Sequence, residues 1–304
     1  MVGMTNQMKR CDMLPLAINA GCDMFLFFND PDEDFATMLN AYKSGIISEE
    51  RMTEALTRIL GLKAHMGLHK KAKEELVPSA EALPAVMQTP EFQTYAPAIS
   101  RDALTLVKYK DEGVLPITPE KYKRIMLVNI KGADTPMGKL MAIAMGSGAG
   151  KKRPVDKLCD KLNEKGFEAF IYESPLDKMM KEVAEGKPFN LNLYFAGKNA
   201  ISEFVSGMDI VITFFNVANG HPVFGMSKGG GEIPWYVHEL PVVGISVNKP
   251  TMLADAPMLR TYINTYDSND DTMDALVDAL LAGPEAFKGT DPIDAYCGMF
   301  DTHM

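Results

Sequence analysis

The chain has 304 residues, of which 46% are hydrophobic and 23% are charged, so its composition is that of a globular protein and excludes disordered and fibrous classes. The 31 Lys and Arg residues against 40 Asp and Glu residues give a net charge of −9, the wrong sign for a nucleic-acid or anionic-membrane partner. No apolar run approaches the roughly 20 residues needed to cross a bilayer. The four cysteines are scattered and form no paired zinc motif, so we expect neither a metal nor another cofactor.

The first elements are predicted from the spacing of apolar residues. Residues Met4–Ala20 have the spacing of a helix, and the apolar run Cys22–Phe28 is typical of a buried parallel strand. Asn29, Asp30 and Pro31 end this run. A single parallel strand cannot satisfy its hydrogen bonds alone, so we expect it either to join the sheet further along the chain or to belong to a larger sheet.

Two more helices follow. The first is expected to be capped by Asp32 or Asp34 and to extend through Asn40. The second is expected to begin after Ser48, which is a good N-cap followed by two glutamates, and to end at Gly67. These 68 residues have the order helix, strand, helix, helix, which suggests the end of a larger domain that begins before Met1.

Residues 69–90 are charged and then interrupted by three prolines, which predicts a linker. Beyond it, strands and helices alternate, which predicts a mostly parallel sheet covered on both faces, a three-layer α/β sandwich over residues 91–304. The predicted helices are 91–101, 154–165, 175–185 and 271–282, and the predicted strands are 103–109, 124–130, 167–172, 208–215, 242–247 and 259–265.

Two glycine clusters are candidate binding loops. Gly146–Lys152 has Met145 where a phosphate-binding loop needs Gly, and Lys152 where it needs Ser or Thr, so a surface loop is the favoured interpretation. Lys228–Glu239 follows a strand at the expected carboxyl edge of the sheet. It contains the sole tryptophan, Trp235, close to Glu232 and two further acid/base groups, His238 and Glu239. A mobile loop that packs Trp235 into a domain interface is favoured over a ligand site.

Several stretches together resemble glycoside hydrolase family 3, whose members join a TIM-like barrel to an α/β sandwich. The match begins with the strand motif Ala20–Met24 and continues through the helix motif Gly45–Lys63 and the sandwich strand Ala103–Lys108. Tyr109 departs from the pattern, because an Asn commonly follows that Lys. The stretch Glu232–Glu239 and the tail Phe287–Asp294 are similar to the β-N-acetylglucosaminidase branch.

The resemblance implies that residues 1–68 are the remnant of a barrel domain, with the last strand and last helix, and that the nucleophile lies upstream of Met1. We therefore expect no catalytic residue in this chain. Asn29 and Asp30, next to Phe28, lie where the last barrel strand would open onto a sugar pocket. Glu232 is a further candidate, because a Glu of the second domain is the acid/base in the β-glucosidase branch, and Trp235 is a candidate for sugar stacking.

The chain is thus predicted to be the carboxyl-terminal portion of a retaining β-N-acetylhexosaminidase, inactive alone, with carbohydrate and the rest of the barrel as its partners. The alternatives are a non-catalytic carbohydrate- or partner-binding module and a β-glucosidase-type member of the family. Uncovered apolar surface around Phe25 and Phe27 favours self-association. No secretory signal is visible at Met1, which favours a cytoplasmic location.

Overall fold

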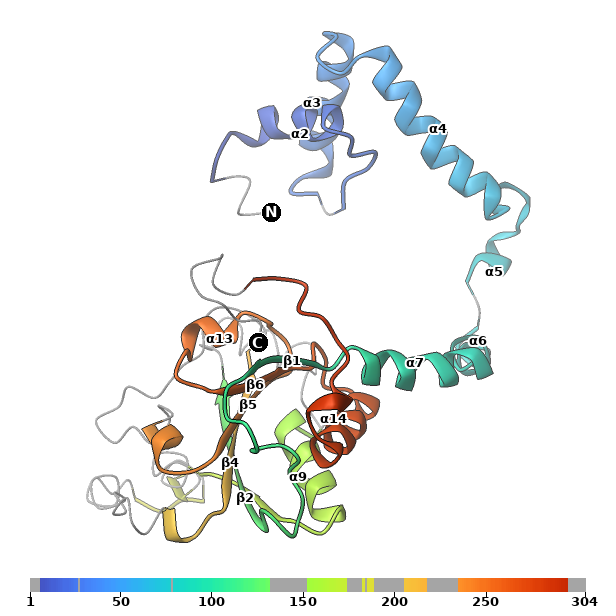
Figure 1. Cartoon of the computed structure of the whole chain (residues 1–304). Coiled ribbons are helices and arrows are strands. Elements are labelled where there is room, and N and C mark those ends of the chain that lie inside the picture. Colours follow the sequence, from blue (N-terminus) through green and yellow to red (C-terminus); the bar gives the residue numbers. More distant parts are fainter. Residues whose placement is uncertain are drawn as a thin grey trace. The chain divides into compact units, whose positions relative to one another are not determined.

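The computed structural model describes residues 6–26, 28–77, 79–131, 152–173, 182–183, 185–188, 205–217 and 235–294. By its internal contacts the chain divides into two compact units, Met1–Gln88 and Thr89–Met304. The boundary between them falls inside the segment 69–90 that the sequence predicts as a linker. Figure 1 shows the helices of the first unit and the twisted sheet of the second.

The first unit is helical in the part that the structure describes. For the helix predicted after Ser48, the N-cap and stop signals are confirmed, because the Ser48 Oγ accepts a hydrogen bond from the Arg51 N–H (3.1 Å) and Gly67 has a left-handed φ of 67°. The helix predicted over Met4–Ala20 is shorter in the structure, since residues 6–9 are not helical and the first described helix begins at Arg10. The elements are α2 (Arg10–Asn19), α3 (Pro31–Lys43), α4 (Glu49–His65), η1 (Leu68–Lys70), α5 (Lys73–Leu76) and α6 (Leu83–Met87).

The predicted strand over Cys22–Phe28 is wrong. Its described residues form no helix or strand, and the side chains of Met24, Leu26 and Phe28 are 65%, 86% and 65% exposed. A strand exists only where a neighbouring strand accepts and donates its backbone hydrogen bonds. No strand is described in the first unit, so the apolar run has nothing to pair with there.

The second unit contains a six-stranded sheet in the order β1-β6-β5-β4-β2-β3. Each described strand falls on a predicted one, and their bounds are β1 (Thr105–Tyr109), β2 (Arg124–Lys131), β3 (Glu168–Ile171), β4 (Ile210–Asn216), β5 (Val242–Ser246) and β6 (Thr261–Asn264). Every pairing is parallel except that of β1 with β6, which is antiparallel. The sheet is therefore mostly parallel, as predicted, with one reversed edge strand.

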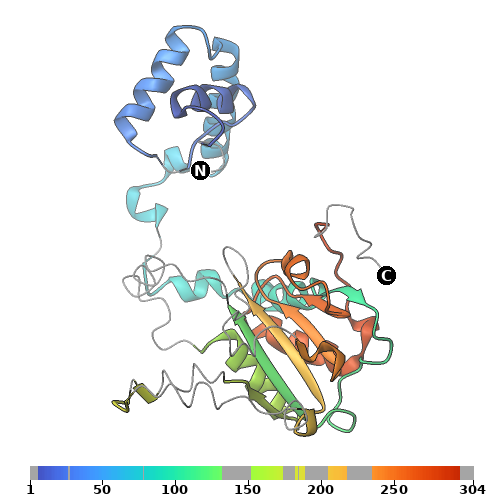
Figure 2. The ribbon, with the colours of Figure 1, turned by 90° about the vertical axis from the view of Figure 1, so that its left-hand side faces the viewer.

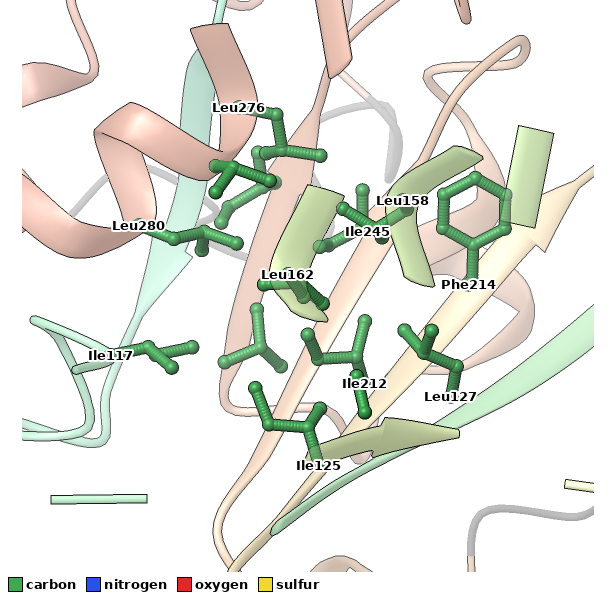
Figure 3. Packing of buried hydrophobic residues seen from close by; sticks show 14 of the residues in the cluster. Ile117, Ile125, Leu127, Leu158, Leu162, Ile212, Phe214, Ile245, Leu276 and Leu280 are labelled. Carbon is green, nitrogen blue, oxygen red and sulfur yellow. The ribbon is translucent and has the colours of Figure 1, made fainter. Parts of the chain in front are cut away.

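One face of the sheet is covered by α9 (Pro154–Glu164) and α14 (Asp270–Ala282), whose positions the sequence predicts. Figure 3 shows Leu158 and Leu162 of α9 and Leu276 and Leu280 of α14 directed at the isoleucines of the strands. All four leucines are at most 1% exposed. Burial of side chains of this size contributes about 1.5–3 kcal/mol each, which makes this layer a main source of stability. The helix α7 (Pro90–Asp102) packs against α14.

The opposite face of the sheet has its own buried cluster, which includes Tyr236, Leu259 and Tyr262, all fully buried. The described elements on this face are the short helices η2 (Trp235–His238) and α13 (Met252–Asp255). A sheet with a buried cluster on each face is the three-layer α/β sandwich that the alternating pattern predicts (Figure 2). The predicted helix 175–185 lies largely outside the described residues.

Candidate functional site

Asp30, one of the two candidate residues of the first unit, is the N-cap of α3. Its Oδ1 accepts hydrogen bonds from the backbone N–H groups of Asp32 (3.1 Å) and Glu33 (2.9 Å). The prediction that Asp32 or Asp34 caps this helix is therefore wrong. Pro31 takes the first helical position, where its missing N–H costs nothing. The N-cap is therefore the residue directly before Pro31, which is Asp30. One of the two carboxylate oxygens of Asp30, Oδ1, therefore binds the start of the helix.

Asn29, the second candidate, is held in place by a hydrogen bond from its backbone N–H. Its N–H donates to the Asp34 Oδ2 at 3.2 Å, and the residue itself is exposed. Asp34 in turn receives two hydrogen bonds from Arg10, from Nε to Oδ1 at 2.8 Å and from Nη2 to Oδ2 at 2.5 Å. The hydrogen bond from Arg10 lowers the pKa of the Asp34 carboxyl below its ordinary value, so Asp34 is ionised at neutral pH.

A second ion pair lies at the other end of the same segment. Asp23 Oδ1 accepts from Arg51 Nη2 at 2.6 Å, and Arg51 Nε donates to the Ile18 carbonyl at 2.8 Å. Glu54 and Arg58 extend this network along α4. The hydrogen bond from Arg51 lowers the pKa of Asp23. These four charged side chains are the ones that give the strand and helix motifs their recognisable pattern, and in the structure they join α2 to α4.

In the second unit, the carboxyl ends of the parallel strands form the edge where open α/β sheets bind ligands. The chain order reverses between β2 and β4, whose ends Lys131 and Asn216 are paired in register. Amide side chains are frequent at this edge: the Asn248 Nδ2 donates to the Asn216 Oδ1 at 2.6 Å, and Asn129 and Asn264 each have a buried side-chain oxygen that accepts no hydrogen bond from the described residues. By topology and polarity, this edge is the candidate site of the second unit.

Both glycine clusters follow, in the sequence, strands that end at this edge. The first occurs between β2 and α9 and the second between β4 and β5, and these two connections leave the strand ends where the chain order reverses. Residues 146–151 and 218–234, which include Glu232, lie outside the described residues. Lys152 is exposed and pairs with Asp160 at 2.6 Å.

The end of the second cluster lies at the opposite edge of the sheet. Trp235–His238 form η2 directly before β5, and the carbonyl of Pro241 accepts from the N–H of Val211, near the start of β4. Tyr236 anchors this turn, because it is fully buried and its hydroxyl lies 3.0 Å from the Thr213 Oγ1. Burial raises the pKa of Tyr236, which keeps the phenol neutral. The side chain of Trp235 lies outside the described residues.

His238 lines an open depression of about 550 Å³ at this amino-terminal edge, with Lys110, Glu112 and Arg260 among its other lining residues. Within the part of the chain that the structure describes, no three His, Cys, Asp or Glu side chains lie close enough to hold a metal ion. No described helix has the length and apolar character of a membrane span.

The sequence interpretation did not identify Arg10, and it named Asp34 only as a possible helix cap, so it missed the ion pair between them. Both are charged residues on predicted helices, where a solvent-exposed position is the ordinary expectation. The available signal was a surplus of carboxylates at the start of α3, where Asp30, Asp32, Glu33 and Asp34 exceed what one helix end needs. Sequence alone does not show that Asp34 pairs with a residue 24 positions earlier.

Comparison with known proteins identifies relatives over the whole chain. A scan against protein-family models finds no match. The curated "Beta-N-acetylglucosaminidase/beta-glucosidase" of Cellulomonas fimi is 34% identical over 309 aligned residues, which cover 100% of this chain and 49% of that enzyme. This chain therefore spans about half the length of that relative.

Two solved structures are also similar. "Beta-glucoside phosphorylase BglX" is 27% identical with a TM-score of 0.65, and the match covers 99% of this chain and 48% of that one. A glycoside hydrolase family 3 β-N-acetylglucosaminidase from Paenibacillus sp. str. FPU-7 has a TM-score of 0.54 at 17% identity, covering 94% of this chain and 48% of that one, and shows the shared fold. With the strand, helix and tail motifs, these matches establish that the chain belongs to glycoside hydrolase family 3 and corresponds to the carboxyl-terminal part of its members.

Proposed function

We propose that this chain is the carboxyl-terminal part of a retaining β-glycosidase that releases terminal N-acetylglucosamine from β-glycosides. The observation that carries the proposal is the 34% identity to the Cellulomonas fimi enzyme along the whole of this chain. The name of that enzyme covers both N-acetylglucosamine and glucose, so a β-glucosidase specificity is the alternative within the same chemistry.

In the retaining mechanism, one carboxylate attacks the anomeric carbon and forms a glycosyl-enzyme, while a second group protonates the departing oxygen and then activates water. We place the nucleophile in the half of the enzyme that this chain does not match. From this chain, Asn29 and Asp30 would contact the sugar, and Glu232 and Trp235 are proposed as further sugar contacts. Exposed amide and carboxylate groups suit a ligand rich in hydroxyl groups.

The partner of the first unit is, by the same proposal, the remainder of a barrel. The apolar side chains of the first unit support a missing partner, because many of them are more than one third exposed and a unit of this size needs to bury them. Examples on α3, on α4 and on the segment between α2 and α3 are Met24, Leu26, Phe28, Phe35, Leu39, Leu56, Leu60 and Leu62.

A fusion protein tests the proposal directly. The chain would be produced alone and joined behind the unmatched half of the Cellulomonas fimi enzyme, and both would be assayed with aryl β-N-acetylglucosaminide and aryl β-glucoside. We expect turnover by the fusion and none by the chain alone. Specific turnover by the chain alone would contradict the placement of the nucleophile. An inactive fusion, together with quenching of the sole tryptophan by a saccharide, would favour the binding-module alternative.

A second candidate reaction is phosphorolysis, which the similarity to a β-glucoside phosphorylase favours. In that reaction an oxygen of inorganic phosphate, rather than water, attacks the anomeric carbon of the glycosyl-enzyme, releases the carboxylate and forms a sugar 1-phosphate. The same fusion, assayed with and without phosphate, distinguishes the two: phosphorolysis predicts a phosphate-dependent rate and a phosphorylated sugar product, and hydrolysis predicts the free sugar under both conditions.

A further inference from the structure

The segment between α2 and α3 is held at both ends by ion pairs. Among the described residues of 22–29, none forms a helix or a strand, so no backbone ladder fixes this part of the chain. At its start, Asp23 is bound by Arg51, whose side chain is 11% exposed. At its end, the N–H of Asn29 is bound by Asp34, whose side chain is 9% exposed and is held by Arg10.

Asp34 is not needed to complete α3. The first free N–H groups of that helix are already bound by Asp30, and an additional carboxylate in the first turn helps the helix dipole equally well when it stays in water. Asp34 is instead buried, which costs free energy unless the charge is paired and hydrogen-bonded. Its three contacts are the two donors of Arg10 and the N–H of Asn29.

A buried ion pair often stabilises a protein no more than apolar side chains of the same volume would, whereas its direction-dependent hydrogen bonds fix geometry. Here the bidentate contact sets the orientation of the carboxylate, and the carboxylate sets the position of the Asn29 backbone. The result is a loop whose main chain is held while the side chains of Phe28, Asn29 and Asp30 remain exposed.

We infer that Arg10 and Asp34 are positioning residues, which hold the backbone at Asn29 so that Asn29 and Asp30 are presented to the sugar. The inference rests on the proposed function. Neither Arg10 nor Asp34 touches the sugar: Arg10 acts through Asp34, and Asp34 acts through Asn29. The Arg51–Asp23 pair fixes the other end of the same segment, at Asp23. The position of Asn29 therefore depends on the Arg10–Asp34 pair.

Hydrogen exchange on this chain tests the first half of the inference without any activity assay. In Asp34→Ala the Asn29 N–H loses its acceptor, so its exchange should become about tenfold faster, the equivalent of one hydrogen bond. Asp32→Ala is the matched control, because Asp32 is an exposed carboxylate in the same helical turn. Asp34→Asn, which keeps the shape and one acceptor oxygen, should give an intermediate rate and remains informative if Asp34→Ala fails to fold.

Kinetics of the fusion protein test the second half. Asp34→Ala should raise KM about tenfold and leave kcat within a few-fold, because the sugar contacts are displaced while the catalytic groups are untouched. Arg10→Lys, which retains a single charged donor, should lie between wild type and Asp34→Ala. A merely structural role would lower the active fraction, and with it kcat, at constant KM.

The outcomes of the two experiments are separable. Asn29 exchange or KM in Asp34→Ala equal to that in Asp32→Ala would overturn the positioning role. An inactive wild-type fusion would overturn the proposed function and the sugar contact with it, and the exchange rate would then decide whether Arg10 and Asp34 hold the loop.

Discussion

At the residue scale, the tail motif Phe287–Asp294 has a structural explanation in Gly289. Its N–H donates to the carbonyl of Leu104 at 2.9 Å, just before β1. A Cβ at this position would lie 2.3 Å from the Thr105 Oγ1 and 2.5 Å from the carbonyl oxygen of Ala103. The backbone oxygen cannot rotate away, so only glycine allows the tail to lie this close to the first strand.

We therefore predict that Gly289→Ala destabilises the second unit by about 1–3 kcal/mol, the usual cost of inserting a methyl group into filled space. The measurement is the midpoint of urea unfolding followed by the fluorescence of the sole tryptophan. Lys288→Ala, at the exposed neighbouring position, is the control and should change the free energy of unfolding by less than about 0.5 kcal/mol. Equal midpoints for the two variants would contradict the packing described for the tail.

At the element scale, α9 and α14 are joined by a row of three ion pairs above their shared apolar core. Lys157 pairs with Asp270 at 2.7 Å and Lys165 with Asp278 at 2.8 Å, and Lys161 pairs with Asp274 between them. The lysines repeat every fourth residue on one helix and the aspartates every fourth residue on the other, so one face of each helix carries one sign of charge. The aspartates are 60–74% exposed, which limits what each pair contributes.

The row predicts a salt-dependent effect of charge reversal. Lys161→Glu should destabilise the second unit by about 1 kcal/mol at low ionic strength, because it replaces an attraction with repulsion from three aspartates, and by clearly less at about 0.5 M salt. Lys161→Gln should cost less than half as much. Urea unfolding at both salt concentrations measures this, and a loss for Lys161→Glu that is independent of salt would show that the cause is packing rather than charge.

At the scale of the whole molecule, exposed apolar side chains are unevenly distributed. Most of the exposed large hydrophobic side chains among the described residues occur before residue 100, and only Phe170, Val183, Met258 and Ile293 occur after it. The sheet of the second unit has apolar residues buried on both of its faces, and the exposed apolar residues of that unit before residue 100 are confined to α7 (Phe92, Tyr95 and Ile99); all the others before residue 100 belong to the first unit. Large exposed apolar surfaces associate with other protein surfaces in water.

The isolated chain should therefore self-associate as its concentration rises. Leu60→Lys, which places a charge at a 58% exposed position of α4, should shift the population toward the monomer. Thr57→Lys adds the same charge to an exposed position of the same helix and should have little effect. Sedimentation velocity over a range of concentrations measures both, and a wild-type chain that stays monomeric throughout would show that the first unit covers its own apolar side chains.

How much the sequence predicts depends on the range of the interactions involved. The strands β2, β4 and β5 are continuous apolar runs, and Ser48 and Gly67 are local helix signals, so these elements are identified within a few residues. The strand predicted over Cys22–Phe28 has an equally apolar pattern and does not form, because a strand depends on a neighbour as well as on its own residues. For the candidate site of the first unit, the sequence predicts Asn29 and Asp30 but not the hydrogen bonds that hold this part of the backbone.

The sequence by itself therefore determined the α/β class, the order of the strands along the chain and the family, because hydrophobic periodicity and motif spacing are local properties. Tertiary structure decided the antiparallel pairing of β1, the placement of Trp235 at the edge of the sheet opposite to where its loop begins, and the role of Asp34 between Arg10 and Asn29. The physical reason is that each of these features depends on groups far apart in sequence, whose proximity exists only once the chain has folded.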